Sequence, residues 1–157
     1  MTIKSLPLLH VVEPVPASES ALAALHLMLD LAINHLPVVD ATGRYLGLLS
    51  LHDLLREILP AGIRLDHGHP AVNFLGDAGG LLAKHIDQLA ARTAGESADT
   101  DVLPLSEDCP LVEAARRLAE ARVPLPVVDA AGRVAGVLSV RLLFAHLIAH
   151  GDRNDAR

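Results

Sequence analysis

The sequence predicts an α/β fold made of two copies of one β-α-β-β-α unit, packed face to face with pseudo-twofold symmetry. The first observation is a direct repeat, because residues 36–50 (LPVVDATGRYLGLLS) return as residues 125–139 (LPVVDAAGRVAGVLS). The second is a constant offset of 89 residues between the matching Asp, Gly and Ser positions. An internal repeat fixes the architecture before any single residue is interpreted, because repeated units bury their apolar faces against one another. Any binding site is then expected between the two copies.

Composition narrows the classes of protein to which the chain can belong. Of its 157 residues, 51% are hydrophobic but only one is Tyr and two are Phe, which predicts an aliphatic core. A net charge of −6 without a basic stripe argues against nucleic acid as a partner. No run of about 18 apolar residues lacks a charge or proline, so no membrane span is expected. The N-terminal apolar run is too short for a signal peptide and Cys109 has no second cysteine, so we expect a cytoplasmic protein.

The first unit is expected over residues 10–59. It opens with a short edge strand around Pro14, because proline cannot donate to a ladder. A helix follows over residues 21–34, with Ser20 as a candidate N-cap. Its apolar positions, at helical spacings of three and four, are Leu22, Leu25, Leu29 and Ile33.

A hairpin and a second helix complete this unit. Two apolar runs, residues 36–39 and 45–50, are joined by a turn of the Asp-x-x-Gly type, which is typical of a β-hairpin. The closing helix is predicted over residues 51–59 and is stopped by Pro60.

The second unit is expected over residues 100–150 and repeats the same order. A strand over residues 102–105 precedes a helix that has Pro110 in its first turn. The apolar stripe of that helix is Leu111, Ala114, Leu118 and Ala121. The hairpin of residues 125–139 and a closing helix over residues 140–150 follow.

A linker of residues 60–99 separates the two units. It contains one predicted helix near residues 80–92, with Leu82, Ile86 and Leu89 on one face, and then a loop over residues 94–100. Because so long a linker is unusual inside a compact domain, we expect it to be functional or to form an interface.

The repeated pattern Leu-Pro-Val-Val-Asp-x-x-Gly-x-x-x-Gly-x-x-Ser, flanked by helices, resembles the cystathionine β-synthase (CBS) domain. Two such units in tandem are similar to a Bateman module. The resemblance implies a stand-alone regulatory protein, not an enzyme, that forms a disc-like homodimer and signals to an unidentified protein target. It requires no cofactor. The ligand it implies is an adenosine compound such as AMP, ADP, ATP or S-adenosylmethionine, held in the cleft between the repeats.

The resemblance also implies which residues hold that ligand. The family signature Ser/Thr-x-x-Asp is matched by Ser50 and Asp53, with the hydroxyl near phosphate and the carboxylate on the ribose. A carboxylate suits this role because it offers two acceptor oxygens to two hydroxyl donors. Residues expected to line the adenine are Asn34, His35, Leu36 and Pro37, and those expected to form the opposite lip are Val12, Glu13 and Pro14.

The second copy departs from the signature. Ser139 is followed three residues later by Leu142 in place of the aspartate, so this site is not expected to hold a ribose in the same way. In the family, basic residues before the Leu-Pro strand contact ligand phosphates of the neighbouring site. His35 would then point to the altered site and Pro124 to the intact one, with Arg122 or Arg141 as the substitute phosphate partner.

Other interpretations remain open at this point. Asp53 can simply cap its helix, since aspartate is favoured in a first turn. The protein can be a structural homodimerisation module whose sites are degenerate. It can also be metal-responsive, because Asp66, His67 and His69 form a His-x-His motif beside a carboxylate, although no second ligand cluster accompanies it. No catalytic set is predicted, since no base lies near Cys109 in the sequence.

Overall fold

Each repeat forms a three-stranded sheet with two helices, and the computed structural model describes residues 2–5, 10–60 and 78–151. The first sheet has the order β1-β2-β3 and the second the order β4-β5-β6. In each, the first pair of strands is parallel and the second pair antiparallel. The strands are β1 (Val15–Pro16), β2 (His35–Val39), β3 (Tyr45–Ser50), β4 (Leu105–Ser106), β5 (Leu125–Val128) and β6 (Val134–Leu138). The predicted α/β fold with two equivalent repeats is confirmed.

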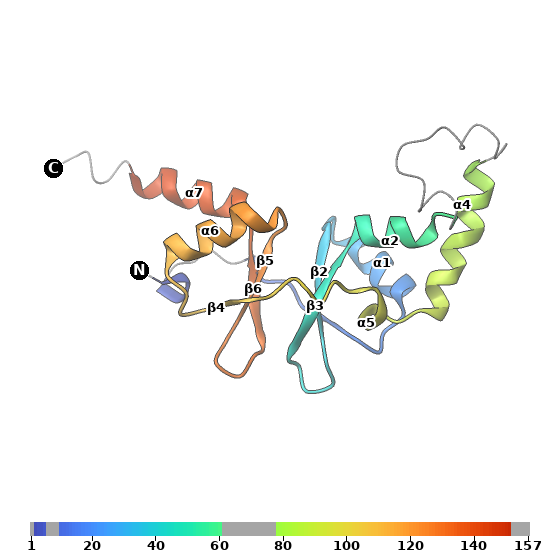
Figure 1. The fold of residues 1–157 in the computed structure, drawn as a ribbon, viewed down its shortest axis with the longest axis horizontal. Coiled ribbons are helices and arrows are strands. Elements are labelled where there is room, and N and C mark those ends of the chain that lie inside the picture. The colour runs from blue at the N-terminus through green and yellow to red at the C-terminus, as the bar shows by residue number, and fades with distance from the viewer. Residues whose placement is uncertain (1, 6–9, 61–77, 152–157) are drawn as a thin grey trace.

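The helices lie outside the paired sheets. Figure 1 shows the two hairpins side by side at the centre of an elongated molecule, with the helices of each repeat toward its own end. The helices of the repeats are α1 (Ala21–Asp30), α2 (Leu51–Ile58), α6 (Leu111–Ala121) and α7 (Val140–Gly151). Each repeat encloses its own hydrophobic core, so the surface between the repeats is left to the strands and the connectors.

The hairpin turns are alike because an aspartate holds each of them. One Asp40 carboxylate oxygen accepts hydrogen bonds from the backbone N–H groups of Thr42 at 2.9 Å and Arg44 at 3.0 Å. Asp129 makes the equivalent bonds in the second turn. The turn glycine has a φ of 85° in the first repeat and 81° in the second, a region that glycine enters without steric cost. The predicted turns are confirmed.

Helix α1 is shorter than predicted, and its predicted apolar stripe is buried only in part. Ser20 caps it as expected, because its hydroxyl accepts a hydrogen bond from the Ala23 N–H at 3.0 Å. The helix ends at Asp30 rather than at residue 34, because Ala32 takes a left-handed φ of 53°. The fully buried positions are Ala21, Ala24 and Met28. Of the predicted stripe, Leu22, Leu25 and Ile33 are partly buried against the same core, whereas Leu29 is 59% exposed. The small alanines allow the central segment to pack closely against this helix.

The central segment contains more structure than one helix. It forms α4 (Ala78–Ile86), the 3-10 helix η3 (Asp87–Ala91) and the short helix α5 (Ala94–Ser97). The predicted loop at residues 94–100 is therefore wrong over residues 94–97. Thr93 caps α5, since its hydroxyl accepts a hydrogen bond from the backbone of Glu96 at 3.2 Å. Burial of Leu89 and Ala94 in the first core holds the segment in place.

The N-terminal residues are the counterpart of α5 in the second repeat. The 3-10 helix η1 (Ile3–Ser5) begins where the Ile3 N–H donates to the Cys109 carbonyl at 3.1 Å. In the same way the Ala94 N–H donates to the Glu19 carbonyl at 2.7 Å. Ile3 is fully buried in the second core. The second core is thus completed by a segment that precedes the first repeat in the chain. The first core is completed by a segment that precedes the second repeat.

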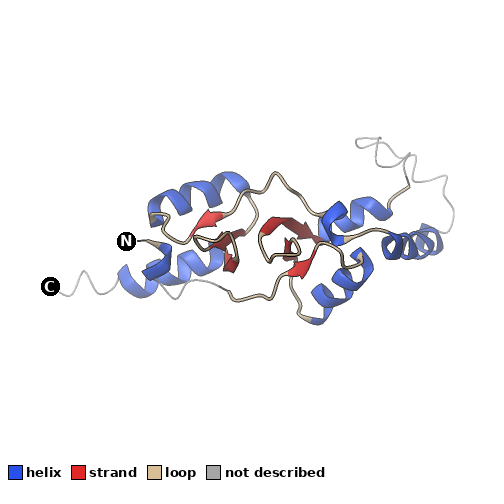
Figure 2. Ribbon diagram, turned by 90° about the horizontal axis from the view of Figure 1, so that it is seen from below, coloured by secondary structure: helices blue, strands red, loops and turns tan. Residues whose placement is uncertain are grey.

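Two connectors cross the centre of the molecule. Residues 10–14 lead into β1 of the first repeat, and residues 98–104 lead from α5 into β4 of the second repeat. Figure 2 shows them as loops on opposite sides of the strands. Asp99 exchanges backbone hydrogen bonds of 2.9 and 3.0 Å with Leu48 of β3. His10 makes the equivalent bonds of 3.0 and 2.9 Å with Val137 of β6. Each third strand is therefore bordered by the connector that leads into the other repeat.

Candidate functional site

A pocket of about 520 Å³, here called the Asp53 pocket, lies at the N-terminal end of α2 between the repeats. The first repeat contributes His35, Leu48, Ser50, His52, Asp53, Leu55, Arg56 and Leu59. The other wall is formed by Asp99 and Val102 of the connector into the second repeat and by Val123, which follows α6. The pocket therefore combines an apolar lining with charged groups of both signs at one helix end.

Ser50 and Asp53 lie together here, as their spacing predicts. Ser50 is the N-cap of α2, and its hydroxyl accepts a hydrogen bond from the Asp53 backbone N–H at 3.0 Å. The Asp53 carboxylate is 28% exposed and lies 3.3 Å from the Arg56 guanidinium. The arrangement keeps a negatively charged acceptor at the pocket wall with a cation one turn further along the helix.

The second repeat has the same serine cap but no carboxylate beside it. Ser139 caps α7 in the same geometry, because its hydroxyl accepts a hydrogen bond from the Leu142 backbone N–H at 3.2 Å. Leu142 stands where the first repeat has Asp53, so the cap forms without an acidic side chain. Capping is done by the serine in both repeats, and a helix-stabilising role for Asp53 is limited to its favourable charge in the first turn.

Four contacts fix the connector that forms the far wall of the Asp53 pocket. A Cβ atom on Gly47 would stand 2.8 Å from the Asp99 carbonyl oxygen, so only glycine allows the chains to approach this closely. The Tyr45 hydroxyl donates to the Val102 carbonyl at 2.7 Å. The Arg117 guanidinium donates to the carbonyls of residues 103 and 104 at 2.8 and 3.0 Å. The wall is thus held by both repeats.

The electrostatics of the Asp53 pocket favour a neutral His35. Burial lowers the pKa of the His35 imidazole, and the nearby His52 lowers it further, while Asp53 opposes the shift. A histidine that resists protonation in the free protein would gain a proton more readily if an anion were placed beside it.

A second pocket, here called the Leu142 pocket, is the pseudo-twofold counterpart of the first. It has a volume of about 290 Å³. It is lined by His10, Val12, Ile33, Asn34, His35, Pro124, Val137, Ser139, Arg141 and Leu142. His35 lines both pockets, because it begins β2 at the boundary between them.

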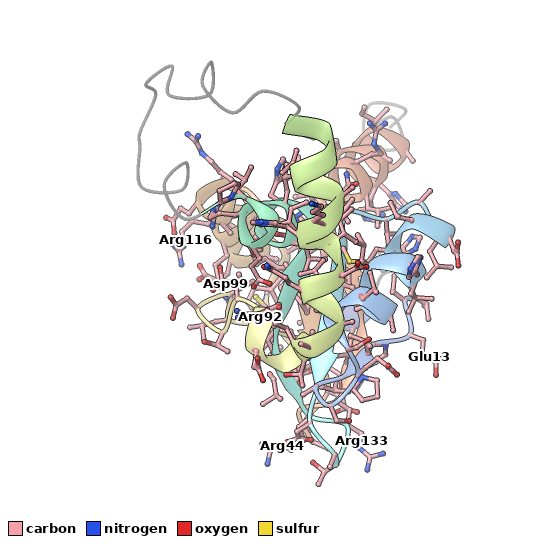
Figure 3. All side chains as sticks on the ribbon, turned by 90° about the vertical axis from the view of Figure 1, so that its right-hand side faces the viewer. Glu13, Arg44, Arg92, Asp99, Arg116 and Arg133 are labelled. Carbon is pink, nitrogen blue, oxygen red and sulfur yellow. The ribbon has the colours of Figure 1, made fainter. Side chains whose placement is uncertain are left out.

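The structure divides the remaining predicted ligand residues among different places. Val12, Asn34 and Arg141 line the Leu142 pocket and not the Asp53 pocket. Glu13 and Pro14 line a separate hollow beside α1. In Figure 3, Glu13 lies on the opposite side of the first repeat from Asp99.

Four other expectations are also corrected by the geometry. Leu36 and Pro37 are buried within β2 and line neither pocket. Arg122, at the end of α6, also lines neither pocket. Pro124 lines the Leu142 pocket rather than the intact one. The predicted opposite lip was placed in the wrong repeat, because the connectors cross.

Sequence reasoning missed several residues of the Asp53 pocket. His52 and Arg56 lie on α2 beside the Ser-x-x-Asp motif, and their helical spacing was the available signal. Asp99 and Val102 gave a weaker signal, since they correspond to His10 at an offset of 89 residues and to Val12 at an offset of 90. Only the crossing of the connectors brings them to α2.

The described part of the chain gives no structural support for a metal site, a membrane-spanning helix or a reactive thiol. The candidates Asp66, His67 and His69 lie outside the described residues. Among the residues that are described, no group of three or more His, Cys, Asp or Glu side chains could hold a metal ion. None of the helices in this part is long and apolar enough to cross a membrane. Burial and Glu113 raise the pKa of the Cys109 thiol, which disfavours a reactive thiolate.

Comparison with known proteins matches both repeats to one family. The family model for the CBS domain matches residues 5–60 and 95–149. The CBS domain-containing protein CBSX2, chloroplastic, of Arabidopsis thaliana is 31% identical over 134 residues, covering 83% of this chain and 55% of the relative. CBSX1, chloroplastic, of the same plant is 28% identical over 152 residues, covering 93% of this chain and 63% of the relative. The chain thus spans less than two thirds of either relative.

Solved structures show the same fold. The crystal structure of CBSX2 from Arabidopsis thaliana superposes with a TM-score of 0.69 at 25% identity, covering 96% of each chain. CBSX2 in complex with AMP gives a TM-score of 0.66 at 24% identity, covering 96% of this chain and 98% of the other. A CBS domain-containing protein of unknown function from Kribbella flavida gives 0.72 at 18% identity, covering 94% and 98%.

Proposed function

This chain belongs to the CBS domain family, and we propose that it is a regulatory module that binds an adenosine nucleotide in the Asp53 pocket. One observation carries the proposal: the Asp53 carboxylate lines an inter-repeat pocket although its helix is already capped by Ser50. A relative of the same family, CBSX2, has been crystallised with AMP, which supports the ligand class.

The ribose is assigned to Asp53 by chemistry and position. Its carboxylate supplies two acceptor oxygens, which match the two hydroxyl donors of a ribose. Arg56 lies 3.3 Å away and helps to orient the carboxylate. Leu142 cannot replace it, so a single such site per chain is expected.

The remaining lining assigns the other parts of the ligand. Leu48, Leu55, Leu59, Val102 and Val123 provide the apolar surface on which a purine base can pack. Donors for a phosphate come from α2 itself, where the Arg56 guanidinium and the His52 imidazole replace Arg122 and Arg141 in the phosphate role proposed from the sequence.

A signal would be passed through the crossing connector. A ligand in the Asp53 pocket touches α2 of the first repeat and, through Asp99 and Val102, the connector into the second. It therefore binds most tightly to one relative arrangement of the repeats, and differential affinity is what a conformational switch requires. The protein target of this signal is part of the proposal, as is a non-catalytic role.

The experiment is a calorimetric titration of the full chain with AMP, ADP, ATP and S-adenosylmethionine, in wild type and Asp53→Asn. Loss of a charged hydrogen-bond partner is worth about 1.5–3 kcal/mol, so the variant should bind about 10- to 100-fold more weakly. Asp30→Asn is the matched control, because Asp30 is exposed at the end of α1 and lines neither pocket. Equal affinity of wild type and Asp53→Asn would refute the assignment.

Homodimerisation is the second proposed function, and the surface of α7 favours it. Val140, Phe144, Leu147 and Ile148 form one stripe of the helix and are 44%, 61%, 46% and 69% exposed. A contiguous apolar stripe of this kind is typical of a protein–protein interface. Light scattering should give a dimer for wild type and a monomer for Phe144→Glu. Dimers in both, together with no nucleotide binding, would leave a structural module with a different interface.

We also propose that the protein is cytoplasmic, as predicted from the sequence. The names of both Arabidopsis relatives include the word chloroplastic, and each relative is longer than this chain.

A further inference from the structure

The Leu142 pocket occupies the position that pseudo-twofold symmetry assigns to a second ligand site. Ser139 and Val137 stand where the Asp53 pocket has Ser50 and Leu48, each 89 residues apart. The connector residue on each edge is also equivalent, because His10 pairs with Val137 as Asp99 pairs with Leu48. The two pockets can therefore be compared position by position.

The charged positions of the two pockets differ, and the net change is toward positive charge. Asp53 is replaced by Leu142, Asp99 by His10, and His52 by Arg141. In the opposite direction, Arg56 of the Asp53 pocket corresponds to Ala145, which does not line the Leu142 pocket. Two carboxylates are therefore lost, while one guanidinium is lost and another is gained. The substitutions convert a pocket with acceptors for hydroxyl groups into one with a donor for an anion.

The available groups in the Leu142 pocket fit that interpretation. Among the described residues, none of its lining side chains is acidic, and Arg141 makes no ion pair with any of them. A guanidinium is a strong and directional partner for a carboxylate, sulfonate or phosphate group. Much of the remaining lining is aliphatic, from Val12, Ile33, Pro124, Val137 and Leu142.

We propose that the Leu142 pocket is a second, chemically distinct ligand site that takes a small anion with an apolar body and no vicinal diol. Arg141 is its anion partner. The apolar body packs on the aliphatic wall, and the missing aspartate removes the selection for a ribose. The inference concerns a ligand different from the nucleotide proposed for the Asp53 pocket and does not require that nucleotide to bind.

The test uses a matched pair of fluorescent probes with the same apolar body. 8-Anilinonaphthalene-1-sulfonate carries an anion, and N-phenyl-1-naphthylamine does not. Arg141→Gln should weaken the sulfonate probe at least about fivefold, which corresponds to about 1 kcal/mol, and leave the neutral probe unchanged. Arg122→Gln is the control, because Arg122 is exposed and lines neither pocket.

Competition and a second variant decide the location of the probe. Saturating AMP should leave the sulfonate probe bound, and Asp53→Asn should not change its affinity. Displacement by AMP, equal losses in Arg141→Gln and Arg122→Gln, or binding that depends on Phe144 of α7 instead of Arg141 would overturn the proposal. If AMP does not bind, only the proposed nucleotide site is contradicted, because binding of the sulfonate probe is judged by its dependence on Arg141.

Discussion

Adding one methyl group at Gly47 should disturb both the fold and the ligand pocket. Its Cβ would stand 2.8 Å from the Asp99 carbonyl oxygen and 3.2 Å from the Ala98 Cβ. The first contact is with backbone, which cannot rotate away as a flexible side chain would. The connector must therefore shift away from β3, and the two Leu48–Asp99 hydrogen bonds of 2.9 and 3.0 Å must lengthen.

The magnitude follows from two opposing effects. Overpacking of a tight contact costs about 1–3 kcal/mol. Replacing glycine by alanine at a strand position stabilises by about 0.4–1 kcal/mol, because the unfolded chain loses freedom. The clash is larger, so Gly47→Ala should lower the free energy of unfolding by about 1–2 kcal/mol. For a chain of this length that corresponds to a fall in Tm of about 2–8 °C.

Thermal unfolding, followed by circular dichroism with and without AMP, measures both consequences. Gly151→Ala is the control, since no atom lies within 4 Å of the position of its added Cβ. Because Asp99 and Val102 form the far wall of the Asp53 pocket, Gly47→Ala should also reduce the stabilisation that AMP provides. An unchanged or raised Tm for Gly47→Ala would mean that the connector does not lie against β3.

Three further outcomes are expected. Leu89→Ala should lower the free energy of unfolding in urea by about 2–4 kcal/mol, because Leu89 is 1% exposed in the first core; a change near zero would detach the central segment from that core. Burial holds the pKa of His35 below 6.5, so the unfolded chain takes up a proton that the folded chain resists, and stability falls as the pH drops below about 6.5. His35→Gln should show a smaller fall in Tm between about pH 8 and pH 5, and a parallel decline in both proteins would contradict this assignment. The triple variant Leu142→Asp, Arg141→His, His10→Asp should raise AMP stoichiometry from one to two per chain in calorimetry, whereas unchanged stoichiometry would show that charge alone does not distinguish the pockets.

Local signals account for the parts of the fold that the sequence predicted well. The hairpins depend on an aspartate that bonds its own turn and on a glycine with positive φ, and both lie within five residues. The caps Ser20 and Ser50 are equally local, since each bonds a backbone group three positions ahead. Such features are readable without knowledge of distant packing.

The errors arise where tertiary packing decides the structure. Helix α5 has only four residues and depends on burial of Ala94 and on a close approach, in which a Cβ at Gly95 would lie 2.9 Å from Ala17. The apolar stripe of α1 was predicted only in part, because Ala21, Ala24 and Met28 are the fully buried positions and Leu29 is exposed. No periodicity in a single helix reveals which neighbour covers it.

The candidate site was predicted in part for the same reason. Ser50 and Asp53 were predicted from the Ser/Thr-x-x-Asp signature of the family that the chain resembles, and the structure places both of them at the start of α2 in one pocket. The opposite wall was assigned to Val12 and its neighbours, whereas Val102 of the other repeat occupies that place. The pocket depends on an exchange of connectors between the repeats, and the spacing of residues within one repeat does not reveal this exchange.

That exchange makes the two halves of the chain interdependent. If the chain were divided between residues 60 and 78, the first piece would carry Ile3, which fills the core of the second. The second piece would carry Leu89 and Ala94, which fill the core of the first. Neither piece is expected to fold alone, but the two mixed together should assemble by fragment complementation. The covalent connection between residues 60 and 78 is then dispensable for holding the halves together, and sequence inserted there need not disrupt either core.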